Sequence, residues 1–120
     1  MMDLPQCPTS PNCVSSQASS AWQSIPPIAF GGCPERAWKQ WCQLIETHPL
    51  VIQLVQKERS LHAVFRTRWF RFRDDLHSLL CEEEGVIHVR SGSRLGYWDM
   101  NANRRRVEDL RHQFQSAPST

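Results

Sequence analysis

Hydrophobic and polar residues alternate along the middle of the chain, as they do in strands that bury one face. The clearest alternation starts at Leu61 and continues to Trp69, with histidine and arginine among the residues of the opposite phase. The phase changes at Trp69-Phe70. Because a slip of one residue exchanges the two faces of a strand, we expect a bulge or a tight turn there. In all, the pattern predicts five strands, over about 24–30, 50–57, 61–69, 73–81 and 86–93.

Two segments that flank these strands show helical spacing. The first covers residues 34–47 and begins with a proline, which suits the first turn of a helix. His48-Pro49 ends it, because the residue before proline avoids the α region. Its expected buried stripe is Ala37, Trp38, Trp41, Leu44 and Ile45. Asp99 or Asn101 caps the second helix. The expected buried stripe there is Val107, Leu110 and Phe114.

The resulting order, β-α-β-β-β-β-α, predicts an α+β fold. We expect a single small domain in which both helices pack on one face of a mostly antiparallel sheet. A length of 120 residues suits one domain. The composition divides the chain into a Pro-, Ser- and Cys-rich N-terminal loop segment over 1–24, an α+β domain over 25–115 and a tail over 116–120.

The charge composition is arginine-rich, with twelve arginines against two lysines. Arginine binds carboxylates and phosphates with two parallel hydrogen bonds, so this bias indicates specific ion pairs or anion binding. The net charge of only +2 does not favour a nucleic-acid partner. No apolar run approaches the ~20 residues that a membrane span needs. Without a visible secretory signal, we expect a soluble, cytoplasmic protein with no transmembrane segment.

The chain contains five cysteines. An odd number without a secretory signal argues against a complete disulfide framework. Cys7 and Cys13 are six residues apart and can close a small loop in an oxidising compartment, so they are the candidate disulfide. The cysteines lack the usual zinc spacing, and we predict no metal site and no cofactor.

Charged residues in the second half of the chain are the main candidates for chemistry. Asp74 and Asp75 are neighbours on a predicted strand and therefore point to opposite faces, which excludes a paired acid and base. Three arginines, residues 104–106, occupy the first turn of the last helix, where the helix dipole is already positive. We expect carboxylates to neutralise them. The candidate structural ion pairs are formed by Asp74, Asp75 and Arg106.

The other interpretation of these arginines is a site for a carboxylate or a phosphate. Arg66 and Arg68 share a strand face with His62, and Arg90 shares one with Arg94. The partner expected for such a site is a small anionic ligand or a protein, and the acidic turn at residues 82–84 makes nucleic acid the weaker choice. The candidate ligand-binding residues are Arg66, Arg68, Arg90, Ser91, Ser93, Arg94, Tyr97, Asp99, Asn103 and Arg104.

An enzyme is the alternative class. It would be a small hydrolase or a thiol-dependent enzyme that uses Cys13 or one of the strand histidines His62, His77 and His88. Histidines that alternate with apolar residues on a strand are usually half-exposed side chains without a catalytic role, and no motif here supplies a nucleophile with a paired base. We therefore assign no catalytic residue and expect a non-enzymatic binding or accessory module.

Four segments together resemble a known family. They read CPTSPNCVSS over residues 7–16, FRFRDD over 70–75, VIHVRSGSRLGY over 86–97 and NRRRVE over 103–108. These motifs are similar to those of the domain of unknown function 1499 family, and the resemblance covers nearly the whole chain. The resemblance implies no established activity. Many relatives look exported or membrane-tethered, whereas this chain begins almost directly at the cysteine motif. Asn101 stands where the family typically has glycine.

Overall fold

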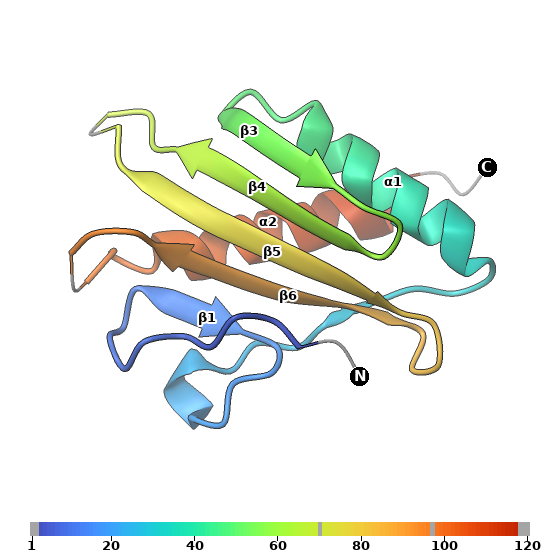
Figure 1. Cartoon of the computed structure of the whole chain (residues 1–120), viewed down its shortest axis with the longest axis horizontal. Coiled ribbons are helices and arrows are strands. Elements are labelled where there is room, and N and C mark those ends of the chain that lie inside the picture. Colours follow the sequence, from blue (N-terminus) through green and yellow to red (C-terminus); the bar gives the residue numbers. More distant parts are fainter. Residues whose placement is uncertain (1–2, 70, 97, 118–120) are drawn as a thin grey trace.

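The structure is a computed structural model, and it describes residues 3–69, 71–96 and 98–117. A six-stranded antiparallel sheet forms one layer and two helices form the other (Figure 1). The strands are β1 (Cys13–Ser15), β2 (Ile28–Ala29), β3 (Val51–Gln56), β4 (Ser60–Arg66), β5 (Arg73–Cys81) and β6 (Val86–Ser93). The helices are α1 (Pro34–Glu46) and α2 (Ala102–Ser116), with a short 3-10 helix η1 (Ala21–Gln23). The predicted α+β class is confirmed.

The strand order in the sheet is β1-β6-β5-β4-β3, and β2 also pairs with β6. β3 to β6 form the predicted meander, in which each strand pairs with the next. Residues opposite each other in neighbouring strands share a face of the sheet. Phe65 lies opposite Asp74, and Asp74 lies opposite Ser93. This register carries one row of side chains toward the helices and the next row away from them.

The core fills the space between the covered face of the sheet and the two helices. Trp41 of α1 is fully buried, and its indole Nε1 donates a hydrogen bond of 2.9 Å to Ser78 Oγ on β5. Its ring meets Phe114 of α2 edge-on, with 5.7 Å between the ring centroids. The apolar stripes predicted for both helices are buried as expected, apart from Leu44, which is partly buried.

The N-terminal segment differs from the predicted loop, because residues 13–15 form strand β1. They pair with Gly92, Ser91 and Arg90 of β6, and Val14 enters the core. Three residues are too few to show an alternating pattern, and the prolines and serines around them are typical of loops. The prediction of a loop was therefore wrong for this short edge strand.

The expected turn near residue 70 lies between β4 and β5. Thr67 closes it, since its backbone N–H donates to Phe72 O at 2.8 Å and its hydroxyl accepts the Phe72 N–H at 2.8 Å. β4 ends at Arg66, three residues earlier than the sequence pattern suggested. Arg68 therefore lies in the turn and does not share a strand face with Arg66. The turn's own hydrogen bonds replace the strand pairing that the alternation predicted.

Candidate anion-binding site

The face of the sheet that the helices leave uncovered carries polar side chains in register. His62 of β4 lies opposite His77 of β5, and His77 lies opposite Arg90 of β6. The two imidazole rings are stacked, with 4.3 Å between centroids. Burial and the nearby charges of His62 and Arg90 lower the pKa of His77 to about 4. His77 is therefore neutral at pH 7, although it lies among cations.

Asp75 is the acidic centre of this uncovered face. Arg94 binds its carboxylate with two hydrogen bonds, Nε to Oδ2 at 2.9 Å and Nη2 to Oδ1 at 3.0 Å. His62 Nε2 lies 2.7 Å from Oδ1. Partial burial opposes ionisation of Asp75, but the hydrogen bonds from Arg94 and His62 outweigh it and lower the pKa to about 2. The carboxylate is thus occupied by Arg94 and His62 of the chain itself.

Arg90 lies beside this centre and against the N-terminal strand. A Cβ atom placed on Gly92 would be 3.0 Å from Cys13 Sγ and 3.3 Å from Arg90 Nη1, so the glycine makes room for both groups. Burial lowers the pKa of Arg90, and its Nε is buried with no hydrogen-bond partner in the described chain. A partly buried guanidinium with an unused donor is one component of an anion site.

Two further arginines face each other across β4 and β5. Arg66 lies opposite Arg73 in the register, so their side chains leave the same uncovered face about 5 Å apart at Cβ. Both are exposed. Within residues 3–69, 71–96 and 98–117, neither has a carboxylate at ion-pair distance. Two like charges in opposed positions destabilise a strand pair unless an anion lies between them.

These arginines belong to a larger group at one end of the sheet. The turn between β4 and β5 and the loop between β6 and α2 meet there, where the Arg94 N–H donates to Arg73 O at 3.0 Å. Both segments are at the left of Figure 1. We call this region the basic end, and its arginines are Arg66, Arg68, Arg71, Arg73 and Arg94. Three non-glycine residues with left-handed backbone are also found here: Arg71, Met100 and Asn101.

Asn101 has a left-handed backbone conformation, which suits the glycine that the family resemblance led us to expect at this position. Its φ of 63° is one that glycine adopts freely and that asparagine tolerates better than most residues. Asp99 caps α2 from outside, because its carboxylate accepts the backbone N–H of Asn101 at 2.9 Å and of Asn103 at 3.0 Å. Of the two predicted capping residues, Asp99 supplies the side-chain bonds, and Asn101 occupies the cap position without one.

Four of the predicted ligand residues lie in a buried network on the covered face. Asn103 is its centre, and its amide group contacts Ser91, Ser93 and Asp99 at 2.6, 2.9 and 2.7 Å. Asn103 Oδ1 also accepts a hydrogen bond of 2.8 Å from Arg106 Nη1. These groups bind one another. The sheet separates Ser91, Ser93 and Asn103 from the arginines of the uncovered face, whereas Asp99 is half-buried in the loop between β6 and α2. The structure therefore does not bring the ten predicted ligand residues into one site.

Arg106 also forms the ion pair that joins α2 to the sheet. Its Nη2 lies 2.8 Å from Asp74 Oδ2, and both side chains are buried. Neither carboxylate oxygen of Asp74 has an aligned hydrogen bond in the described chain, so the contact is mainly electrostatic. The guanidinium also lies over the Phe65 ring, 4.8 Å from its centroid. Asp74 and Asp75, neighbours in sequence, thus bind different arginines on opposite faces.

Two predicted ligand residues remain, Arg104 and Tyr97. Arg104 donates to the backbone oxygens of Trp22 at 2.9 Å and Ser24 at 3.2 Å, which holds η1 against α2. Tyr97 lies outside the described residues. Sequence reasoning also missed two members of the basic end, Arg71 and Arg73. The register that places Arg73 opposite Arg66 has no signature in the local sequence.

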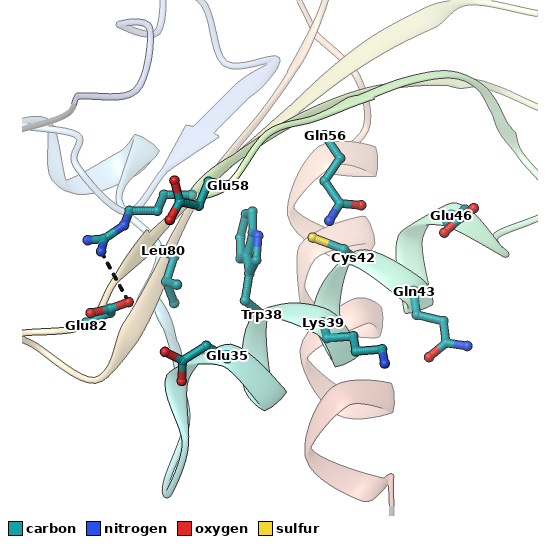
Figure 2. Close-up of a pocket in the computed structure, with 11 residues that line it drawn as sticks. Glu35, Trp38, Lys39, Cys42, Gln43, Glu46, Gln56, Glu58, Leu80 and Glu82 are labelled. Atoms are coloured by element: carbon teal, nitrogen blue, oxygen red, sulfur yellow. Dashed lines mark ion pairs between the residues drawn. The ribbon is translucent and has the colours of Figure 1, made fainter.

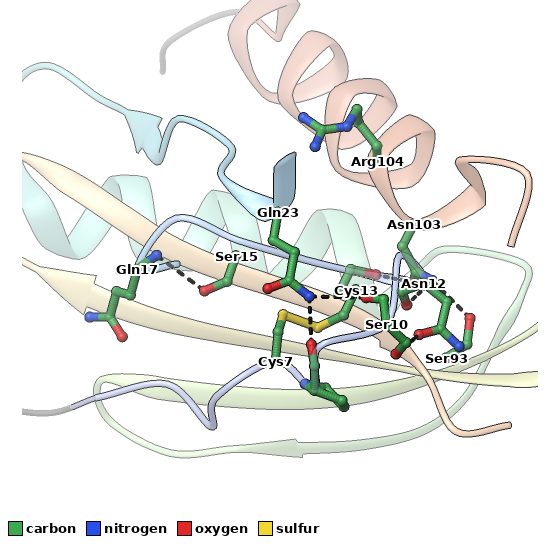
Figure 3. Close-up of a disulfide and its surroundings, with 12 residues drawn as sticks. Cys7, Ser10, Asn12, Cys13, Ser15, Gln17, Gln23, Ser93, Asn103 and Arg104 are labelled. Carbon is green, nitrogen blue, oxygen red and sulfur yellow. Dashed lines mark hydrogen bonds between the residues drawn. A yellow bond between two sulfur atoms is a disulfide. The ribbon is translucent and has the colours of Figure 1, made fainter. Parts of the chain in front are cut away.

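The N-terminal loop is closed by a disulfide between Cys7 and Cys13 (Figure 3). Asn12 connects this loop to the basic end, because its Nδ2 donates to Gly96 O at 2.8 Å and its backbone oxygen accepts from Asn103 at 3.1 Å. Cys13 is buried and has no free thiol, so it offers no nucleophile. Disulfides persist mainly in oxidising compartments, and the cytoplasmic location stays a prediction.

A second polar cluster surrounds His88 on the uncovered face. His88 Nδ1 is 3.0 Å from Ser16 Oγ, and His88 Nε2 is 2.8 Å from Glu84 Oε1. Cys81 lies close by, and one ligand atom from each of Cys81, Glu84 and His88 falls within 4.8 Å of the others. Ser16 also accepts the Val89 N–H at 2.9 Å. The cluster is a hydrogen-bonded serine, histidine and glutamate, a combination that also occurs in hydrolases.

A pocket of about 450 Å³ lies at the opposite end of the sheet. Figure 2 shows Trp38 standing from α1 into it, between Leu80 and Cys42. The Trp38 Nε1 is buried and has no hydrogen-bond partner in the described chain. We call this region the acidic end, and its glutamates are Glu35, Glu58, Glu82, Glu83 and Glu84. The pocket is also lined by Lys39 and Arg59, so its lining carries charges of both signs.

A model of the family described as Protein of unknown function (DUF1499) matches residues 3–114, which is nearly the whole chain. The chain therefore belongs to this family, as the sequence motifs suggested. No curated protein and no solved structure matches it. Within the described ranges, neither helix has the length and the apolar content that a membrane crossing requires.

Proposed function

We propose that this chain is a non-enzymatic module that binds an anionic ligand at its basic end. One observation supports this most directly: Arg66 and Arg73 are opposed on the uncovered face and have no carboxylate partner in the described chain. A phosphate or carboxylate between them turns a repulsive pair into two charge-assisted contacts. This arrangement is the reason for proposing a phosphate or carboxylate as the ligand and Arg66 and Arg73 as the residues that bind it.

The neighbouring charges give the site its selectivity for anions. Asp75 lies two residues from Arg73 on the same face of β5, and Arg94 and His62 occupy its carboxylate. Arg68 and Arg71 extend the positive region into the turn between β4 and β5. Because the site is open to solvent, we expect weak binding that decreases as salt is added.

Thermal unfolding with inorganic pyrophosphate at constant ionic strength tests the proposal. A ligand at 100 times its dissociation constant stabilises a protein by about 2.7 kcal/mol, which raises the midpoint of a domain of this size by several degrees. The double variant R66Q/R73Q should lose this shift. The matched control K39Q/K57Q removes the same charge at the acidic end and should keep it. An equal loss in both variants would show that net charge, and not the site, is responsible.

The hydrolase alternative keeps one geometric support, the cluster of Ser16, His88 and Glu84. In that function Ser16 Oγ attacks an ester carbonyl and passes its proton to His88 Nδ1, while Glu84 stabilises the imidazolium. The test is the hydrolysis of p-nitrophenyl acetate by the wild type, S16A and S19A. A rate that is lost only in S16A supports an esterase. A rate unchanged in S16A leaves the cluster with the structural role of holding β1 against β6.

A further inference from the structure

The basic end also carries most of the exposed apolar surface of the described chain. The described chain has eight exposed large hydrophobic side chains. Five of them are at the basic end: Trp69, Phe72, Leu95, Trp98 and Met100. Trp69 is 85% exposed and Leu95 is 79% exposed, in different segments. Such a gathering at one end of a small domain indicates an interaction surface, since isolated exposed hydrophobics are normally scattered.

These apolar side chains are mounted on two neighbouring projections. Trp69 and Phe72 belong to the turn between β4 and β5, and Leu95, Trp98 and Met100 belong to the loop between β6 and α2. The two segments project at the same end of the sheet, at the left of Figure 1, and the chain segments behind them are joined by the hydrogen bond from Arg94 N–H to Arg73 O. The arginines of the basic end occupy the same segments or the strand ends directly behind them.

We propose that the basic end docks onto the surface of a lipid bilayer that contains anionic headgroups. The inference rests on the proposed anion site and names the source of the anion. Tryptophan is the side chain that favours the boundary between headgroups and acyl chains, and leucine and methionine add apolar area that enters it. The arginines then contact lipid phosphates, which supplies the charge complementarity that apolar insertion alone lacks.

The composition of the surface favours a bilayer over other macromolecules. Single-stranded nucleic acid binds to aromatic platforms that line a groove. Trp69, Phe72 and Trp98 offer rings, but none of four pockets formed by described residues lies among them. Leu95 and Met100 offer no ring on which a base can stack. The residues that dominate a protein–protein interface usually fill pockets at its centre. The same four pockets are lined by other parts of the chain, and none of them is at the basic end. Two projecting apolar loops backed by arginine fit a deformable, anionic, apolar-cored surface.

The measurement is co-sedimentation of the full chain with two kinds of vesicle, phosphatidylcholine alone and an equimolar mixture of phosphatidylcholine with phosphatidylglycerol. We expect binding to the mixed vesicles only. The variant R66Q/R73Q should reduce the partition coefficient about 30-fold, at roughly fivefold for each basic residue near an anionic surface. The variant W69A/W98A should reduce it at least tenfold. The control is W22A, which removes an exposed tryptophan of η1, outside the basic end, and should bind as the wild type does.

The pyrophosphate experiment keeps the two proposals distinguishable. If R66Q/R73Q abolishes the pyrophosphate shift but W69A/W98A sediments with mixed vesicles as the wild type does, the anion site stands and the docking proposal is overturned. Absence of both pyrophosphate and vesicle binding overturns both. A single-stranded oligonucleotide that binds through Trp69 and Trp98 while vesicles do not also overturns docking and assigns the surface to nucleic acid. Circular dichroism confirms that each variant is folded.

Discussion

The two ends of the sheet differ in the sign of their charged side chains and in whether those side chains form ion pairs. At the acidic end, glutamates surround a pocket with an indole at its centre, and Glu82 has a cationic partner in Arg59, 3.6 Å away. At the basic end, Arg66 and Arg73 have no such partner in the described chain, and apolar side chains project beside them. The acidic end is concave and the basic end projects. The difference indicates that the two ends suit partners of opposite charge.

The comparison also shows why net charge is a poor guide to this protein. The formal charge of +2 sums fourteen basic and twelve acidic residues, and it does not reveal that five arginines gather at one end of the sheet and five glutamates at the other. β5 has nine residues and connects the two ends, which sets them about 30 Å apart at ~3.4 Å per residue. This is several times the Debye length of about 8 Å at physiological salt. Each end therefore presents its own charge to solvent, independently of the other.

The largest expected effect comes from removing Arg106, which joins α2 to β5 of the sheet through its ion pair with Asp74. The variant R106M leaves Asp74 buried without a counter-ion, and we expect a loss of about 3 to 5 kcal/mol in the free energy of unfolding. Urea unfolding followed by circular dichroism measures it. The exposed neighbour Arg105 is the control, and R105M should change stability by less than about 1 kcal/mol. Equal effects of the two variants would contradict the role of the Asp74 ion pair.

Acid should destabilise the uncovered face in two steps. The pKa of His77 is lowered to about 4, so the unfolded chain binds more protons than the folded one between pH 6.5 and 4. Stability from His77 is complete above pH 6.5 and is lost as pH falls through this window, by about 2 to 3 kcal/mol. Asp75, with its pKa lowered to about 2, continues the loss below pH 3.8.

The variant H77L separates these two steps. It cannot take up a proton, so the dependence of unfolding free energy on pH between 6.5 and 4 should become flatter than in the wild type. The exposed His112 of α2 provides the control, and H112L should keep the wild-type slope. A wild-type slope in H77L would mean that His77 is not held neutral by its burial. Denaturant titrations at half-unit pH intervals are sufficient.

Opening the disulfide should affect the two ends unequally. The C7S/C13S variant frees a seven-residue loop, and we expect a loss of about 2 kcal/mol. Because Asn12 holds Gly96, amide exchange in the loop between β6 and α2 should accelerate, while exchange at the acidic end should stay unchanged. The control C33S alters an exposed free cysteine. Uniform acceleration over both ends would argue against a specific link to the basic end.

The smallest effect is expected from the acidic end. The variant E58Q/E82Q removes two carboxylates that line the pocket and raises the net charge of the chain by two. Since the two ends are screened from each other, pyrophosphate binding at the basic end should change by less than about twofold at physiological salt. Repeating the titration at low salt should enlarge the effect. A large increase in pyrophosphate affinity at physiological salt would show that the charges of the acidic end influence binding at the basic end.

Periodicity predicted the elements of this fold, because it reports directly on which side chains face the core. The α1 stripe with Trp38 and Trp41, and the opposite faces of Asp74 and Asp75, follow from helix and strand geometry alone. The strand β1 escaped prediction because three residues between prolines and serines leave no pattern. At the N-terminus, the spacing of Cys7 and Cys13 was enough to make them the candidate disulfide, which the structure contains.

The candidate site was predicted only in part, for a physical reason. Arg66 and Arg94 were identified by type and position, but the pairing of Arg66 with Arg73 depends on strand register, which long-range packing determines. The serines and Asn103 were grouped with the arginines because they are close in sequence. In the structure, the sheet separates them. Neighbours along a strand alternate between faces, so closeness in sequence misled the assignment where the faces differ.

The separation of charge along β5 gives the molecule an electric dipole moment that points along this strand. A chain with a positive end and a negative end experiences a torque near any charged surface, and it turns before it makes contact. Near an anionic surface it therefore arrives with the β4–β5 turn leading, and fewer collisions are wasted on wrong orientations. The glutamate-lined pocket then points back into solution. If the basic end docks as proposed, the glutamate-lined pocket would therefore stay accessible from the solvent.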